Sequence, residues 1–151
     1  MSPALFLERL FEEGWKIIYL TRENKVDQVI SNLISQERGK WHKTTSEEEK
    51  IEITVDCNIL AAKIHERIRF ERAERESLRN VDFLEIVYDD ELKESSMHQA
   101  TSNKVFEYLA LEPTDVYTPY MRINTFNLEK IITNYNDFLK CIRKNGWENF
   151  I

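Results

Sequence analysis

An arginine and a serine on one strand–turn–helix segment are the side chains of this chain best suited to bind an anion. The segment Lys16–His42 begins with the apolar run Ile17–Leu20, continues through the polar turn Thr21–Asn24 and ends in a helical pattern. Arg22 lies in the turn, where its guanidinium would add charge-assisted hydrogen bonds to the N–H groups and dipole of the helix start. The local pattern leaves two interpretations open. The turn is either an anion site or an ordinary solvated connection.

Two further residues of this segment are candidates for the same chemistry. Ser31 lies about two turns into the helix and reaches the turn only if the ligand runs along the helix. His42 is a candidate general base or ligand contact, although a histidine in a polar stretch is more often a plain loop residue. The sequence therefore assigns no catalytic residue.

Composition bounds the class of protein. A length of 151 residues predicts a single domain over 1–151. Only 3 Gly and 3 Pro occur, which favours helices joined by few tight turns. A net charge of −6 provides no basic surface of the kind that nucleic acid requires, so we expect no nucleic-acid partner.

The two cysteines and the length of the apolar runs indicate the cellular compartment that we expect for the protein. Cys57 and Cys141 are far apart and have no metal-ligand spacing, so we expect two reduced thiols, no metal and a cytoplasmic protein. No apolar run approaches the roughly 18 residues of a membrane span.

The pattern of apolar residues predicts an α/β fold, a small parallel sheet covered by helices. Strands are expected at 15–21 and 83–88, with 51–55 as a third candidate. Proline, capping residues and glycines delimit the helices. They are expected from Ser2–Pro3 to Gly14, from Asn24 to about Gln36, over 57–79 after Asp56, and over 102–111, 128–134 and 135–144. The acidic run Asp89–Glu91 is expected to cap a helix rather than to bind a metal.

Three blocks of sequence, taken in order, resemble the carboxyl-terminal part of the sulfotransferase superfamily, bacterial carbohydrate and glycolipid type. The first is IIYLTREN…QVISNLIS…GKWH (17–42), similar to that family's strand, arginine turn and serine-bearing helix. The second is FLEIVYDDEL (83–92), similar to its strand with an acidic end. The third comprises VFEYLAL (105–111) and MRINTFNLEKIITNYNDFLKCI (121–142), similar to its closing helices.

The resemblance implies a nucleotide donor, 3′-phosphoadenosine-5′-phosphosulfate (PAPS), and no metal. Carried over to this chain, Arg22 and Ser31 would hold the donor's 3′-phosphate. A carbohydrate or glycolipid would be the acceptor. The implied fold is an incomplete version of the three-layer P-loop type.

The family's phosphosulfate-binding loop has no counterpart in Met1–Trp15. Such loops stabilise the charge that develops on the leaving phosphate, so we expect a truncated protein with no useful turnover on its own. An incomplete sheet would expose an edge or an apolar patch and favour a homo-oligomer. The alternatives are a non-catalytic interaction or oligomerisation module, and one part of a split enzyme or incomplete reading frame.

Overall fold

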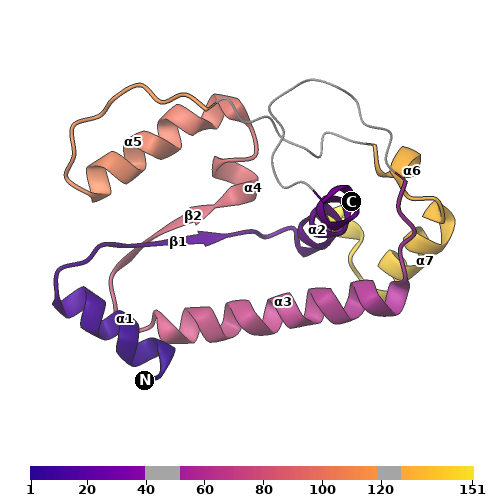
Figure 1. The fold of residues 1–151 in the computed structure, drawn as a ribbon, viewed down its shortest axis with the longest axis horizontal. Coiled ribbons are helices and arrows are strands. Elements are labelled where there is room, and N and C mark those ends of the chain that lie inside the picture. The colour runs from indigo at the N-terminus through magenta and orange to yellow at the C-terminus, as the bar shows by residue number, and fades with distance from the viewer. Residues whose placement is uncertain (40–51, 119–126) are drawn as a thin grey trace. The chain divides into compact units, whose positions relative to one another are not determined.

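The computed structural model describes residues 1–39, 52–118 and 127–151 (Figure 1). Backbone contacts divide the chain into two compact units. The sheet unit comprises residues 1–23 and 68–117, and the helix unit comprises 24–67 and 118–151. The long helix α3 (Cys57–Ser77) contributes its end to the former and its start to the latter. A single domain over 1–151 stays a prediction.

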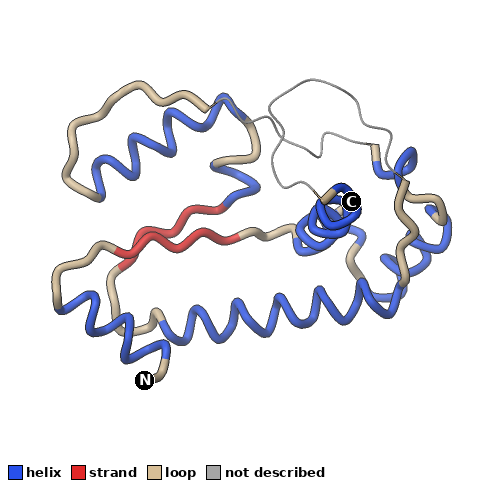
Figure 2. The backbone as a smooth tube through the Cα atoms, in the orientation of Figure 1, coloured by secondary structure: helices blue, strands red, loops and turns tan. Residues whose placement is uncertain are grey.

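The sheet unit is built on two parallel strands, β1 (Ile17–Thr21) and β2 (Phe83–Val87). They pair in register from Ile17 opposite Phe83 to Thr21 opposite Val87, and they lie side by side in Figure 2. Both strands fall within the predicted ranges. The predicted mixed α/β class with a small parallel sheet is therefore confirmed.

The third candidate strand, 51–55, is wrong as a member of this sheet. Ile53 forms an isolated parallel bridge with Ile132, within the helix unit. Its N–H donates to the carbonyl of Ile131, and its carbonyl accepts from the N–H of Thr133. Both backbone groups of Ile53 are therefore hydrogen-bonded within the helix unit. The alternation of apolar and polar residues around Ile53 corresponds to an isolated bridge and not to a strand of the sheet.

The remaining elements of the sheet unit lie on opposite sides of the strand pair. In Figure 1, α1 (Pro3–Glu12) and the end of α3 lie on one side, and α5 (His98–Tyr108) on the other. Two short helices, α4 (Tyr88–Glu91) and η1 (Ser95–Met97), connect β2 to α5.

The predicted ends of α1 are confirmed by their caps. The Ser2 side chain accepts from the N–H of Leu5, Pro3 opens the helix, and Gly14 follows it at φ 87°.

Helix α5 begins earlier and ends earlier than the predicted 102–111. It starts at His98, and it ends at Tyr108 because Ala110 adopts a left-handed conformation at φ 54°. There the N–H of Leu111 turns back to the carbonyl of Phe106, which is a helix-ending bond.

The helix unit consists of the start of α3 and four further helices. These are α2 (Lys25–Arg38), α6 (Leu128–Ile131), α7 (Tyr135–Asn145) and η2 (Glu148–Phe150). Its core consists of buried aliphatic and aromatic side chains: Val26, Val29, Ile30, Ile34, Ile53, Val55, Leu60, Ile64, Ile131, Ile132, Phe138, Ile142 and Trp147. The caps predicted from the sequence are confirmed. Asn24 accepts from the N–H of Asp27, and Asp56 accepts from the N–H groups of Asn58 and Ile59.

The expectation of two reduced cysteines is wrong. Cys57, at the first turn of α3, and Cys141, buried in α7, form a disulfide. Packing of α7 against the start of α3 brings the two together although 84 residues separate them. Their distance in sequence concealed this proximity.

We expect reduction of the Cys57–Cys141 disulfide to destabilise the helix unit. A cross-link across 84 residues is worth about 4.5 kcal/mol in the chain-entropy model. Urea unfolding with and without dithiothreitol, followed by circular dichroism, measures the loss. The double variant Cys57→Ser/Cys141→Ser should match the reduced protein and should no longer respond to the reductant. Equal midpoints for the oxidised and reduced wild type would contradict a stabilising cross-link.

Candidate functional site

The carboxyl ends of β1 and β2 bring three functional side chains together. Arg22 follows β1, and Tyr88 and Asp89 follow β2, so parallel pairing brings all three to one edge. The Arg22 Nε lies 3.5 Å from Asp89 Oδ1, and its Cζ lies 4.7 Å from the centre of the Tyr88 ring. We call these three residues the edge cluster. In parallel sheets this edge is where ligands generally bind.

The edge cluster is largely withdrawn from solvent. The Arg22 and Asp89 side chains are 15% and 13% exposed. An ion pair this deep is costly to break by removing one partner, because the other charge is left buried. Stacking on Tyr88 holds the plane of the guanidinium. An anionic ligand would therefore bind Arg22 by taking the place of the Asp89 carboxylate.

A second polar group lies beside the edge cluster, around Glu91. Its Oε1 accepts from Lys104 Nζ at 2.6 Å, and its Oε2 accepts from the N–H of Val87 at 2.6 Å. Hydrogen bonding to Lys104 lowers the pKa of Glu91, burial raises it, and the bond from Val87 lowers it further, with a net decrease. The acidic run lies inside the one-turn helix α4, whose N-cap residue Val87 has no side-chain cap hydrogen bond, so the predicted role of this run as a helix cap is not confirmed.

The predicted mouth of the anion site, Thr21–Asn24, is only partly available. Thr21 is buried, and its hydroxyl donates to Glu85 across the strand pair. The Asn24 side chain caps α2 through its oxygen and donates from its nitrogen to the carbonyl of Phe150. Arg22 therefore differs from Thr21 and Asn24, because its side chain lies beside Tyr88 and Asp89 at the carboxyl ends of the strands.

The other predicted site residues lie elsewhere. Ser31 is part-buried in α2, in the helix unit, whereas Arg22 belongs to the sheet unit. Joint binding of one phosphate by Arg22 and Ser31 stays a prediction. His42 lies outside the described residues.

Sequence reasoning missed the roles of Tyr88 and Asp89. A signal was present, because residues that follow two paired parallel strands must meet at one edge. With β1 and β2 both predicted, the opposite charges of Arg22 and Asp89 could have been matched directly.

No metal cluster and no membrane-spanning helix occur in the part of the chain that the structure describes. Within residues 1–39, 52–118 and 127–151, no group of three or more His, Cys, Asp or Glu side chains is arranged to hold a metal ion. No helix in those ranges is both long enough and apolar enough to cross a membrane.

Comparisons with known proteins give no family. No protein-family model, no curated protein and no solved structure matches the chain. The functional argument therefore depends on the chain's own residues.

The Glu91 network predicts a pH-dependent contribution to stability. Because the pKa of Glu91 is lowered by folding, its stabilisation is present above the unfolded value of about 4.3 and is lost as the pH falls through the folded value. Glu91→Gln should cost about 1 kcal/mol at pH 7, since the charged hydrogen bonds weaken and Lys104 is partly exposed. The difference from wild type should shrink as the pH is lowered through the acidic range, as measured by urea unfolding. Glu107→Gln, an exposed position on α5, serves as the control and should change little at either pH.

Proposed function

We propose that the chain is a sulfotransferase-type, nucleotide-binding protein whose edge cluster receives the 3′-phosphate of PAPS. The observation that supports this is the position of Arg22. It follows the first strand of a parallel pair, it stacks on Tyr88, and the Asn24-capped helix α2 begins directly after it in the chain. Parallel strand, basic turn and helix start form the arrangement that proteins use repeatedly to bind phosphate.

Binding on this proposal is an exchange of anions. A phosphate dianion offers Arg22 two hydrogen-bonded oxygens and competes with the Asp89 carboxylate, whose Oδ1 lies 3.5 Å from the Arg22 Nε. The exchange is opposed by the charge of Asp89, which remains near the incoming phosphate. Neutralising Asp89 should therefore strengthen binding, while removing Arg22 should weaken it. Ser31 is proposed to add a hydroxyl donor.

The proposal covers binding and not turnover. No general base is assigned, and no phosphosulfate loop is proposed within the described residues. The same proposal includes three further parts. The acceptor is a carbohydrate or glycolipid, the fold is an incomplete three-layer P-loop type, and the isolated chain is inactive.

The proposal includes a cytoplasmic location, and the disulfide bears on it. Disulfides persist mainly in oxidising compartments, so the Cys57–Cys141 pair argues against it. Thiol labelling of the protein in its native host measures whether Cys57 and Cys141 are reduced or disulfide-bonded there.

Titration calorimetry with adenosine 3′,5′-bisphosphate tests the site. We expect Arg22→Ala to weaken binding at least about tenfold, since a hydrogen bond to a charged group is worth about 1.5–3 kcal/mol. Ser31→Ala should weaken binding by a smaller factor. Asp89→Asn should strengthen it, because the competing charge is gone and the shape is kept.

The matched control is Arg9→Ala, which removes an exposed arginine of the same unit. It should leave the affinity unchanged. No binding by the wild type, or equal weakening by Arg9→Ala and Arg22→Ala, would sink the proposal.

A second candidate function, a non-catalytic association module, is favoured by exposed apolar residues around β1. Trp15, Ile18 and Leu20 are 61%, 41% and 55% exposed. Ile18 and Leu20 alternate with Tyr19, so they share one face of a strand in a two-stranded sheet. Such a face is a candidate surface for self-association.

Light scattering at micromolar concentration tests this second candidate. We expect a dimer or larger assembly that Leu20→Glu dissociates by placing a charge on the apolar face. Leu111→Glu is the control, since Leu111 is equally exposed but lies outside β1. A monomeric wild type would contradict the association module.

A further inference from the structure

Each strand of the sheet unit has one outer edge, and the outer edge of β2 is already occupied. The Glu85 carbonyl accepts from Lys104 Nζ at 2.9 Å, and the Val87 N–H donates to Glu91 Oε2 at 2.6 Å. Successive residues of a strand direct their backbone groups to opposite edges, so Glu85 and Val87 both point away from β1. Side chains from α5 and α4 therefore take the place of a further strand beside β2.

The outer edge of β1 has no such cover. By the same alternation, Leu84 and Ile86 are the residues of β2 that bond to β1. Ile18 lies opposite Leu84 and Leu20 lies opposite Ile86, so the N–H and carbonyl groups of Ile18 and Leu20 point outward. Within residues 1–39, 52–118 and 127–151, no hydrogen bond reaches these outward groups. The edge thus presents two donors, two acceptors and two exposed apolar side chains.

We infer that a second copy of the chain pairs antiparallel with β1 along this edge, about a two-fold axis at Tyr19. The pairing sets Ile18 opposite Leu20 of the second copy, and Leu20 opposite its Ile18. Both are hydrogen-bonded pairs of an antiparallel ladder, so the two copies exchange all the outward donors and acceptors of these residues. This inference rests on the association module proposed above, and it assigns the partner and the contact.

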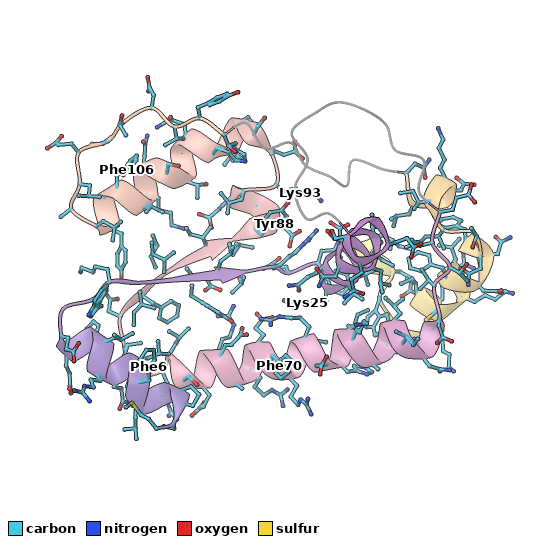
Figure 3. All side chains as sticks on the ribbon, viewed as in Figure 1. Phe6, Lys25, Phe70, Tyr88, Lys93 and Phe106 are labelled. Carbon is cyan, nitrogen blue, oxygen red and sulfur yellow. A yellow bond between two sulfur atoms is a disulfide. The ribbon has the colours of Figure 1, made fainter. Side chains whose placement is uncertain are left out.

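The two edges of the strand pair favour a second copy as the occupant. A two-fold axis presents the same edge twice, so each apolar side chain meets another apolar side chain and no charge is buried. Helices α3 and α5, on which Figure 3 labels Phe70 and Phe106, lie on opposite sides of the strand pair, so the sheet grows along its edge. Growth stops at four strands, in the order β2–β1–β1–β2, because Lys104 and Glu91 occupy the outer edge of β2.

Two cations flank β1, and this register brings Lys16 of one copy opposite Arg22 of the other. Like charges directly opposite each other would weaken the pairing. Each cation is held by its own chain, since Lys16 Nζ lies 5.1 Å from the centre of the Tyr108 ring and Arg22 stacks on Tyr88 beside Asp89. The carboxylate of Asp89 balances the charge of Arg22, so the pairing requires no contact between two uncompensated cations.

Amide hydrogen exchange, followed by nuclear magnetic resonance on the full chain, tests the backbone pairing. The Ile18 amide should exchange at least about tenfold more slowly in the wild-type dimer than in the dissociated variant Leu20→Glu at the same concentration. The Tyr19 amide, which bonds to β2 in either state, should change less than the Ile18 amide. The control Leu111→Glu, at an exposed residue outside β1, should keep the slow exchange.

Cysteine cross-linking tests the register. Hydrogen-bonded antiparallel pairs have Cα atoms about 5.5 Å apart, within disulfide range, whereas diagonal neighbours are about 7–8 Å apart, at or beyond its limit. Mild oxidation should therefore convert Ile18→Cys/Leu20→Cys to a covalent dimer on a non-reducing gel. The single variants Ile18→Cys and Leu20→Cys are the matched controls and should give at least about fivefold less. Cys57 and Cys141 are already joined to each other and do not compete.

The possible failures are distinguishable. A monomeric wild type would overturn both the association module and the pairing. A wild-type dimer whose Ile18 amide exchanges as fast as in monomeric Leu20→Glu would overturn the pairing alone, as would a Leu20→Glu variant that remains dimeric. Equal cross-linking of the double variant and the single variants would overturn the register.

Discussion

Parallel pairing of β1 with β2 is the constraint on which the edge cluster depends. The register that puts Thr21 opposite Val87 also brings the next residues, Arg22 and Tyr88, to one edge. Asp89 then follows within ion-pair distance of Arg22. On the face towards α3 the same register sets Tyr19 beside Glu85. A single isolated strand could form neither contact, because each contact joins a residue that belongs to β1 or follows it to a residue of β2 or of a helix beside it.

Charged side chains hold the strand pair against the end of α3. Glu85 of β2 accepts from Thr21 of β1 and from Arg75 of α3, and Tyr19 of β1 donates to Glu74 of α3. A two-stranded sheet buries too little apolar surface to be stable by itself, so such contacts between strand and helix matter more here than in a larger sheet. Two acidic side chains therefore have definite partners on the inner face.

The helix unit is held together differently. A core of aliphatic residues is reinforced by the Cys57–Cys141 disulfide and by Asn134, whose side chain bonds both the N–H and the carbonyl of Val55. The amide satisfies both backbone groups of a buried residue that belongs to no sheet. Covalent and polar ties thus connect the start of α3 with the carboxyl-terminal helices. Reduction should affect this unit first.

Local signals in the sequence determined β1, β2, the starts of α1, α2 and α3, and the caps at Ser2, Asn24 and Asp56, because apolar period and capping residues act within a few positions. They also identified Arg22 as the side chain of its turn most suited to an anion. Only the tertiary structure decided that Arg22 faces Asp89 and Tyr88, that Cys57 meets Cys141, and that Ile53 joins Ile132 rather than the sheet. Each of these contacts joins residues more than 60 positions apart, at distances over which local periodicity carries no information. The physical reason is that strand pairing and helix packing, rather than neighbouring residues, select these partners.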